Sequence, residues 1–482
     1  MSQFDLVVQN GIIVTANDIF KADIGLAGGK IVALGDRLDA ERTIDADAKY
    51  VFPGFVDAHV HMQLPVGDIV SADDFTTGAI AAACGGVTTI VDFVTPKRGQ
   101  SLQKAVERRR NQADGRVAVD YALHLTAIDA SPQTLDALPR LAEQGYTSLK
   151  MYMTYPAVRV SDGEMLRLLQ TCRENGILPL VHAENHDSIE HLQKQLLASG
   201  KNEPRWHPHS RPPIVEAEAV HRALCLAQLA GAPLYLVHIS CAESLAVIQL
   251  RRRRGQTAFA EVCVQHLLLS DRCYEQPRTA AHFVLAPPLR AAADQEALWR
   301  ALADGQLNVV STDHCPWTRA QREQGGNDFT KIPNGVPGVE TRIPLIFDRG
   351  VNAKRLSLRR FVDVCATTPA RLFGLHPRKG TIAIGSDADL VIFDPDQPWR
   401  LSAKALHQNV DHCPYQDWPG RGYPHTVVLG GHIIVQAGQF VGHPGQGVFV
   451  PRHQFNADQN WDTQNLDTLN WDTLSPGTAG AR

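Results

Sequence analysis

The stretch Phe55-Val56-Asp57-Ala58-His59-Val60-His61 is a short apolar run that carries two histidines one residue apart. Successive side chains of a β-strand point to opposite faces, so His59 and His61 share a face only if this run is a strand. Pro53-Gly54 precedes the run and favours a break between two elements. Residues 62–67 no longer alternate between apolar and polar side chains, as is typical of a loop. A His-X-His pair at a strand end is a candidate metal-binding motif, although the pair alone is weak evidence for a metal site.

Seven further apolar runs follow along the chain, at residues 86–92, 117–124, 147–152, 178–182, 233–238, 258–263 and 307–313. Patterns of helical period fall between them, as at residues 101–111, 163–174, 215–230 and 294–303. This alternation is typical of parallel strands joined by crossover helices. Eight such units predict an α/β fold of the (β/α)8 barrel type, whose active site lies at the carboxyl ends of the strands.

Both ends of the chain have the sequence pattern of short β-strands joined by tight turns, for example at residues 6–14 and 23–34 and again at 388–393 and 426–435. Two distant β-rich ends are best explained by one small β-sandwich with the barrel inserted between its parts. The predicted domains are residues 1–53 and 378–454 for the sandwich, 54–377 for the barrel and 455–482 for a C-terminal tail.

The tail contains a short polar repeat, Asn460-Trp461-Asp462-Thr463 and Asn470-Trp471-Asp472-Thr473. One interpretation of such a segment is a disordered tail, which its polar composition favours. The other interpretation is an arm that docks on a neighbouring subunit of an oligomer. The two tryptophans of the repeat are the argument for docking.

The bulk composition narrows the class of protein and its partners. The chain has 482 residues, of which 44% are hydrophobic and 20% charged, as in ordinary globular proteins. Its net charge of -4 gives no reason to expect nucleic acid or an acidic membrane surface. No signal peptide or membrane-spanning run is apparent, and nine scattered cysteines fit reduced thiols. We therefore expect a cytoplasmic protein with a small-molecule partner.

Polar side chains with metal-binding chemistry recur in or at the ends of the predicted strands: His59, His61, Lys150, His182, His238 and Asp313. In a barrel of parallel strands these positions converge on one rim. Each residue alone has an ordinary explanation, such as a helix cap for Asp313. Five metal-type side chains on one rim are hard to obtain by accident, so the sequence predicts a metal site.

Lys150 is the unusual member, because an ammonium group is a poor metal ligand. Burial and positive neighbours would lower its pKa and free the amine to react with carbon dioxide. The product is a carbamate, an N6-carboxylysine, whose two oxygens could bridge two metals. The alternative is a lysine that forms an ion pair with Asp313.

Seven short motifs occur in chain order: Asp57-Ala58-His59-Val60-His61, Lys150-Met151-Tyr152-Met153-Thr154-Tyr155, Val181-His182-Ala183-Glu184-Asn185, Val237-His238-Ile239-Ser240, Ala286-Pro287-Pro288-Leu289-Arg290, Thr312-Asp313-His314-Cys315-Pro316 and Ile332-Pro333-Asn334-Gly335. In this combination the chain resembles the hydantoinase and dihydropyrimidinase branch of the cyclic amidohydrolases, in the amidohydrolase superfamily. The resemblance covers nearly the whole chain, sandwich included. It implies a hydrolase that acts on cyclic amides and self-associates as a tetramer or dimer.

The resemblance also implies a ligand set for two divalent metals: His59, His61 and Asp313 for one, His182 and His238 for the other, and carboxylated Lys150 as the bridge. Zinc is the expected metal, with manganese as the alternative. A hydroxide that bridges the two metals would attack the cyclic amide carbonyl. The ring would open to an N-carbamoyl amino acid.

The same resemblance gives roles to residues beside the metals. Tyr155, on the loop after the fourth strand, would donate to the developing oxyanion. Asp313 would take a proton from the hydroxide and pass it to the leaving ring nitrogen. Asn334 and Ala286 would bind the imide edge of the substrate. Relatives commonly carry serine before Pro-Pro-Leu-Arg, so at Ala286 only the backbone can serve.

The identity of the ring depends on the loop after the first strand. Dihydroorotases and allantoinases place a basic or otherwise distinct polar residue shortly after the His-X-His pair, whereas this chain has Met62-Gln63-Leu64-Pro65-Val66. Leu64 and Phe93 suggest an apolar wall around the exocyclic substituent of a 5-substituted hydantoin or of a dihydropyrimidine. The plainer alternative is that these loops merely pack on one another.

Three other functions stay open at this point. The first is an allantoinase or another cyclic-ureide hydrolase. The second is a hydrolase of N-acyl amino acids or a nucleobase deaminase, although those relatives often use one metal and lack the lysine of the fourth strand. The third is a non-catalytic scaffold on the same fold. The presence of every predicted ligand argues against the scaffold.

Overall fold

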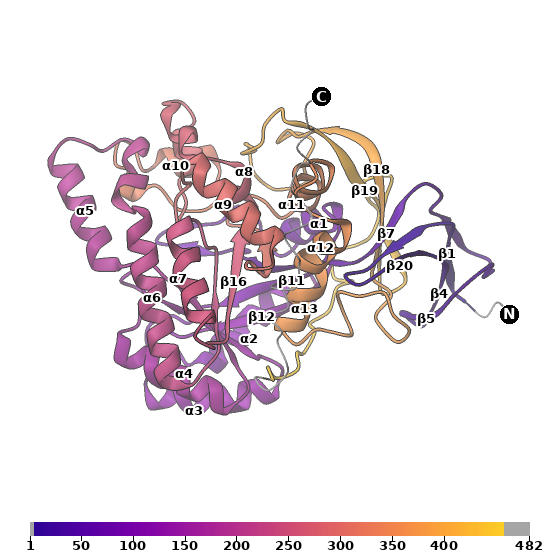
Figure 1. Cartoon of the computed structure of the whole chain (residues 1–482), viewed down its shortest axis with the longest axis horizontal. Coiled ribbons are helices and arrows are strands. Elements are labelled where there is room, and N and C mark those ends of the chain that lie inside the picture. The colour runs from indigo at the N-terminus through magenta and orange to yellow at the C-terminus, as the bar shows by residue number, and fades with distance from the viewer. Residues whose placement is uncertain (1–3, 457–482) are drawn as a thin grey trace, which may run out of the picture.

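A barrel of eight parallel strands lies at the centre of the molecule, and helices surround it (Figure 1). The computed structural model describes residues 4–456. The barrel strands are β8 (Phe55–Val60), β11 (Val87–Val94), β12 (Asp120–Thr126), β13 (Ser148–Tyr152), β14 (Leu178–His182), β15 (Leu234–Leu236), β16 (Ala258–Cys263) and β17 (Val309–Ser311). Adjacent strands pair in chain order, and a parallel bridge from Val60 to His314 closes the ring. The predicted (β/α)8 fold is confirmed.

The barrel strands are buried along almost their whole length, as expected for parallel strands covered on both faces. The long outer helices are α2 (Leu102–Ala113), α3 (Pro132–Glu143), α4 (Asp162–Glu174), α5 (His186–Ala198), α6 (Pro213–Ala230), α7 (Ala242–Arg252) and α9 (Ala292–Ala303). Serine residues cap three of them, at Ser101, Ser131 and Ser161. Each serine oxygen accepts a hydrogen bond from a backbone N–H of the first turn.

Shorter elements fill the connections. The short α-helices are α1 (Thr77–Cys84), α8 (Val264–Leu268), α10 (Arg319–Glu323), α11 (Arg342–Ile346), α12 (Leu358–Val362) and α13 (Thr368–Leu372). The 3-10 and π turns are η1 (Pro204–Trp206), η2 (Pro208–Ser210), η3 (Asp271–Glu275), η4 (Ala280–Phe283), η5 (Phe329–Lys331), η6 (Phe347–Asn352) and η7 (Asp363–Thr367). Several of these short elements follow β16 and β17, so the loops after these two strands are built from short helices and turns.

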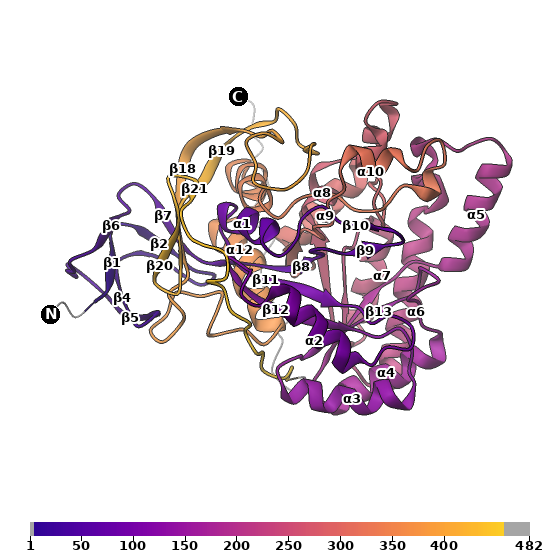
Figure 2. The ribbon, with the colours of Figure 1, turned by 180° about the vertical axis from the view of Figure 1, so that it is seen from behind.

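Strands from both ends of the chain build a two-layered β-structure beside the barrel (Figure 2). One sheet has the order β5-β4-β1-β6, with β1 (Leu6–Gln9), β4 (Asp23–Ala27), β5 (Lys30–Gly35) and β6 (Thr43–Asp45). The other has the order β21-β20-β19-β18-β7-β2-β3, with β2 (Ile12–Val14), β3 (Ile19–Lys21), β7 (Tyr50–Pro53), β18 (Leu390–Arg400), β19 (Pro419–Leu429), β20 (His432–Gln436) and β21 (Gln439–Phe440). Antiparallel pairing of β7 with β18 joins the two chain ends.

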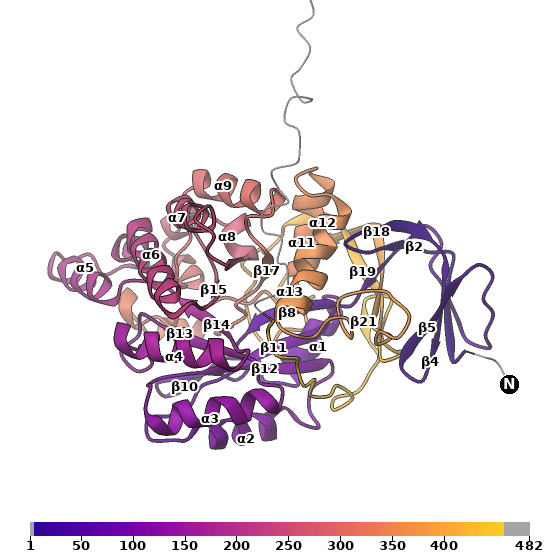
Figure 3. The same cartoon turned by 60° about the horizontal axis from the view of Figure 1, so that its bottom comes forward.

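The sandwich lies at one side of the barrel (Figure 3). Lys379 connects the two, because its buried ammonium pairs with Asp120 on a barrel strand and with Asp387 and Asp389 beside the sandwich. After the sandwich the chain returns to the barrel, where Val448 and Val450 hydrogen-bond to Tyr121. The domain boundaries stay predictions, and residues 457–482 of the predicted tail at 455–482 lie outside the described residues.

Observed elements lie close to the predicted ones, with one difference next to His61. The predicted loop contains a short antiparallel pair, β9 (Pro65–Val66) with β10 (Ile69–Val70). A strand is recognised in a sequence by alternating apolar and polar residues, which reflect a buried and an exposed face. Val66 and Val70 of this hairpin are both exposed, so its sequence lacks that pattern. Within residues 4–456 no helix is long and apolar enough to cross a membrane.

Candidate active site

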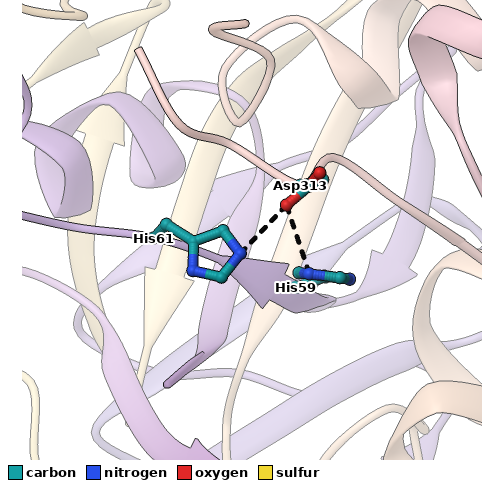
Figure 4. A group of neighbouring side chains, drawn as sticks. All are labelled: His59, His61 and Asp313. Atoms are coloured by element: carbon teal, nitrogen blue, oxygen red, sulfur yellow. Dashed lines mark ion pairs between the residues drawn. The ribbon is translucent and has the colours of Figure 1, made fainter. Parts of the chain in front are cut away.

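The first and the last strand of the barrel, β8 and β17, bring three polar side chains together at its carboxyl rim. His59 and His61 lie at the end of β8, and Asp313 follows β17. The Asp313 Oδ1 atom lies 3.2 Å from His59 Nε2 and 3.0 Å from His61 Nε2 (Figure 4). Their ligand atoms all lie within 4.8 Å of one another. The strand alternation inferred from the sequence therefore places both histidines on one side, as expected.

A second pair of histidines lies beside this group. His182 ends β14 and His238 follows β15, and the His182 Nδ1 and His238 Nε2 atoms are 3.0 Å apart. The ring centroids of His59 and His238 are 5.6 Å apart, so the two groups are neighbours. All four histidine side chains are buried. The structure thus brings together the five metal-type residues that the sequence predicted.

Buried carboxylates hold the outer nitrogens of two of these histidines. Glu261 Oε1 lies 2.7 Å from His59 Nδ1, and Glu184 Oε2 lies 2.7 Å from His182 Nε2. Glu184 also accepts a hydrogen bond of 2.6 Å from Arg211. Burial opposes ionisation of Glu184, but Arg211 and His182 lower its pKa to about 2. A carboxylate behind a histidine fixes the ring and its tautomer, as is usual around metal ligands.

The hydrogen bond to Glu184 leaves an unprotonated nitrogen on the inner side of the His182 ring, which can accept a hydrogen bond from His238 Nε2. Because His182 donates its Nε2–H to Glu184, its Nδ1 carries no proton and faces His238. On the other side, His59 Nε2 and His61 Nε2 converge on one carboxylate oxygen. Imidazole nitrogens and a carboxylate, oriented in this way, form a donor set that suits divalent transition metals. The side chains present therefore fit a binuclear divalent metal centre.

Lys150 lies on β13 and is 1% exposed. Burial lowers its pKa to about 8, and the carboxylates of Asp313 and Glu261 act in the opposite direction. The main cause of the lowered pKa of Lys150 is thus burial, and not the positive neighbours that the sequence also suggested. Its charge in turn acts to lower the pKa of His59, His182 and His238, so the amine is felt by both histidine pairs. No ion pair joins Lys150 to Asp313 within 4.0 Å, which argues against the alternative interpretation.

Tyr155 lies above the second histidine pair on the loop after β13. Its ring centroid is 5.4 Å from that of His182, and the Arg211 guanidinium lies 5.7 Å from it. Burial raises the pKa of Tyr155, so the hydroxyl stays protonated at neutral pH. The backbone φ is +67° at Tyr155, +39° at His238 and +49° at Asp313. These values are rare for residues with a side chain, and such strain is typical of functional sites.

Ala286 and Asn334 lie on two loops beside the rim, and both present unpaired polar groups. Among residues 4–456, neither the N–H nor the carbonyl of Ala286 has a hydrogen-bond partner. The Oδ1 atom of Asn334 is buried and also unpaired, whereas its backbone carbonyl accepts from Trp317 Nε1 at 2.9 Å. Unpaired buried polar groups are costly unless a ligand satisfies them, so both positions are candidates for substrate contact.

The two predicted wall residues differ in environment. Leu64 is partly exposed at the base of the β9–β10 hairpin. Phe93 is 4% exposed, and its ring stacks on His61 with centroids 4.7 Å apart and lies 4.8 Å from His59. Phe93 therefore packs against the first histidine pair. Contact of either residue with a substrate stays a prediction.

Sequence reasoning missed the carboxylates behind the histidines. Glu261 interrupts the apolar run of β16, and a lone charge inside a strand of this kind is a signal of a buried polar contact. Glu184 stands two residues after His182, within the motif of residues 181–185. Arg211, which holds Glu184 and covers Tyr155, gave no local signal, because it comes from the segment between η2 and α6.

Comparisons with known proteins agree with this geometry. The model of the Amidohydrolase family matches residues 50–434. The D-hydantoinase of Ralstonia pickettii is 43% identical over 455 residues, which cover 94% of this chain and 99% of the relative. The D-hydantoinase of Geobacillus stearothermophilus is 44% identical over 457 residues, 94% of this chain and 97% of the relative.

Solved structures give the same result. A crystal structure of the dihydropyrimidinase from Brevibacillus agri superposes with a TM-score of 0.92 at 42% identity, covering 93% of this chain and 99% of the other. The L-hydantoinase (dihydropyrimidinase) from Arthrobacter aurescens superposes with a TM-score of 0.86 at 33% identity, covering 93% of this chain and 100% of the other. The similarity therefore includes the sandwich as well as the barrel.

Proposed function

The chain belongs to the hydantoinase and dihydropyrimidinase branch of the amidohydrolase family, and we propose that it opens 5-substituted hydantoins or dihydropyrimidines to N-carbamoyl amino acids. It is a hydrolase that acts on cyclic amides. The observation that carries the proposal is the two groups of histidines at the carboxyl rim of the barrel together with the buried Lys150, which has no ion-pair partner among residues 4–456. The apolar loop after His61 favours these rings over dihydroorotate.

In the proposed centre His59, His61 and Asp313 would hold one divalent ion, His182 and His238 would hold the other, and Lys150 would serve both. For this role the Lys150 amine would add to carbon dioxide and release one proton, which would give a carbamate with two oxygen donors. We propose zinc, with manganese as the alternative. When bound, such ions lower the pKa of water and polarise a carbonyl oxygen.

Asp313 is proposed to move the proton of the reaction. Its Oδ1 atom faces both histidines of β8, while Oδ2 has no hydrogen-bond partner in the described part of the chain. This free oxygen takes the proton of the attacking water and passes it to the ring nitrogen as the C–N bond breaks.

The remaining residues orient the ring and stabilise the transition state. The Tyr155 hydroxyl donates a hydrogen bond to the oxygen of the attacked carbonyl as negative charge develops there. The backbone of Ala286 and the side chain of Asn334 bind the imide edge, which carries an N–H between two carbonyls. Both present unpaired groups to that edge, and an N–H donor from the ring would satisfy Asn334 Oδ1.

Replacing Tyr155 with phenylalanine is expected to lower kcat by about 10²–10³-fold, since one donor to the oxyanion is lost. The metal content should not change, because the hydroxyl is no ligand. Steady-state kinetics together with metal analysis check both statements. Tyr152→Phe is the matched control, because Tyr152 lies 5.7 Å from the His182 ring but has no proposed role. Unchanged turnover in Tyr155→Phe contradicts the catalytic role.

The substrate class is tested by an assay with quantified metal against hydantoin, 5-phenylhydantoin, dihydrouracil, allantoin and dihydroorotate. We expect opening of the first three rings, with an N-carbamoyl amino acid as product. Hydrolysis of dihydroorotate alone overturns the proposed substrate. Hydrolysis of allantoin alone favours the allantoinase alternative, and a protein that purifies without metal and hydrolyses none of the five favours the scaffold.

We further propose that the chain acts in the cytoplasm and self-associates as a tetramer or dimer. The resemblance to hydantoinases supports the oligomer, and the nine cysteines, all free thiols, fit a reducing compartment such as the cytoplasm. Sedimentation of the purified protein tests the oligomer. A monomer at micromolar concentration contradicts it.

A further inference from the structure

Arg322 of α10 is a buried arginine whose guanidinium donates hydrogen bonds to backbone carbonyls. It is 1% exposed, and burial lowers its pKa to about 10. Its Nη1 atom donates to the carbonyls of Ala281 at 2.7 Å, Val284 at 3.1 Å and Pro333 at 3.3 Å, and Nη2 donates to that of Gly335. Among the residues that the structure describes, no acidic group lies within ion-pair distance of it.

These four carbonyls belong to the two loops that carry the imide-edge residues. Ala281 and Val284 lie just before Ala286, and Pro333 and Gly335 flank Asn334. One direct hydrogen bond also joins the loops, from the Gly335 N–H to the Val284 carbonyl at 3.0 Å. The guanidinium therefore sets the spacing of two segments that are about fifty residues apart in the sequence.

The loop of Asn334 is closely packed, so its position depends on such contacts. Gly335 has a φ of +129°, and a Cβ atom there would lie 2.5 Å from the Cys315 carbonyl oxygen. Trp317 holds the Asn334 carbonyl from the other side. The side chain of Asn334 keeps its unpaired Oδ1 buried in this setting. A shift of the loop would move that oxygen relative to Ala286.

We propose that Arg322 is a positioning residue for substrate: it fixes the distance between Ala286 and Asn334 and so determines how well the imide edge is bound. The inference rests on the proposed function of the site. Contacts to the imide edge exist in the bound ring and in the transition state alike. Their loss weakens binding without slowing the chemical step, so it appears in KM and not in kcat.

Other contacts keep α10 in place without this guanidinium. Thr318 and Gln321 form a capping box at its start, and the Gln321 side chain donates to the Val70 carbonyl at 2.8 Å. The Arg319 N–H donates to Asp411 at 2.9 Å. A change at Arg322 should therefore act on the two loops and leave the helix where it is.

The test is Arg322→Lys, which keeps the charge but gathers its donors on one nitrogen and cannot span both loops. We expect KM for hydantoin and dihydrouracil to rise about tenfold, as for the loss of one or two hydrogen bonds, with kcat and metal content unchanged. Arg252→Lys is the matched control. Arg252 also bonds to carbonyls of two segments, those of Ala258 and Gln306, but at the opposite end of the barrel.

Hydrogen exchange at the Gly335 amide separates this inference from the proposed function. Faster exchange together with a higher KM in Arg322→Lys, but not in Arg252→Lys, supports the inference. Unchanged exchange or an unchanged KM overturns it, and so does a loss of kcat alone. If the wild-type protein opens none of the rings, the proposed function fails and the positioning role falls with it, but the exchange still shows whether Arg322 holds the loops. Arg322→Gln replaces the lysine variant if that protein does not fold.

Discussion

Replacing Lys150 with alanine is expected to abolish ring opening, and added short carboxylic acids are expected to restore part of it. The side chain is buried, and no carboxylate of the described residues forms an ion pair with it, so the proposed carbamate would be free to supply oxygen ligands to the metals. Loss of a shared ligand costs several kcal/mol, so kcat/KM should fall by about 10⁴-fold or more. Formate, acetate or propionate can occupy the space left by the side chain and present two carboxylate oxygens. Activity titrated against each acid, with metal content measured in parallel, checks this.

Lys150→Arg distinguishes the carbamate from the ion-pair interpretation. Arginine keeps the positive charge and fills the space, but it forms no carbamate. If the lysine served only as a charge near Asp313, Lys150→Arg would retain activity and the acids would not rescue Lys150→Ala. If the carbamate is correct, both variants are inactive and only the alanine variant responds to acids. Activity in Lys150→Arg therefore rejects the carbamate.

Much of the barrel and of its rim follows from local sequence pattern. Residues in a strand alternate with period two, and parallel barrel strands end on one rim, so the pattern of apolar runs alone places His59, His61, His182 and His238 together. The same reasoning locates Asp313 after the last strand. These positions are predictable because their geometry depends on secondary structure and chain order alone.

Contacts made through tertiary structure could not be predicted in this way. Glu261 reaches His59 from β16, which only β17 separates from β8 in the barrel but which lies about two hundred residues away in the sequence. Arg322 lies in a short helix whose charged sequence is typical of a solvated surface, yet it is buried by the loops of Ala286 and Asn334. The left-handed backbone at Tyr155 also has no local cause, because only the surrounding structure can enforce it.

The sandwich shows the same division. Short strands with glycine turns at both ends of the chain were enough to predict one domain built from the two ends. The register of β7 on β18 and the ion pairs of Lys379 depend on side chains that meet only after folding. Sequence pattern therefore indicates which chain segments share a domain, and not which strand registers and ion pairs hold them together.

Asp313→Asn is expected to reduce kcat by about 10⁴-fold or more at saturating metal, because it removes both a proposed negatively charged ligand and the proposed proton carrier. Asparagine has nearly the same shape as aspartate, but its amide can neither hold the proton of the attacking water nor return it to the ring nitrogen. The measurement is kcat with hydantoin at increasing zinc or manganese, with the bound metal quantified at each point.

His61→Asn separates the two roles of Asp313, because it also removes one ligand from the same proposed metal site but leaves the carboxylate in place. If Asp313 were a ligand only, the two variants would have similar kcat values once metal is fully bound. General acid–base transfer is worth about 10²–10⁴-fold, so we expect Asp313→Asn to be slower than His61→Asn by that factor. Equal rates at equal metal content would mean that another group carries the proton, since Oδ2 of Asp313 would then contribute nothing beyond its charge.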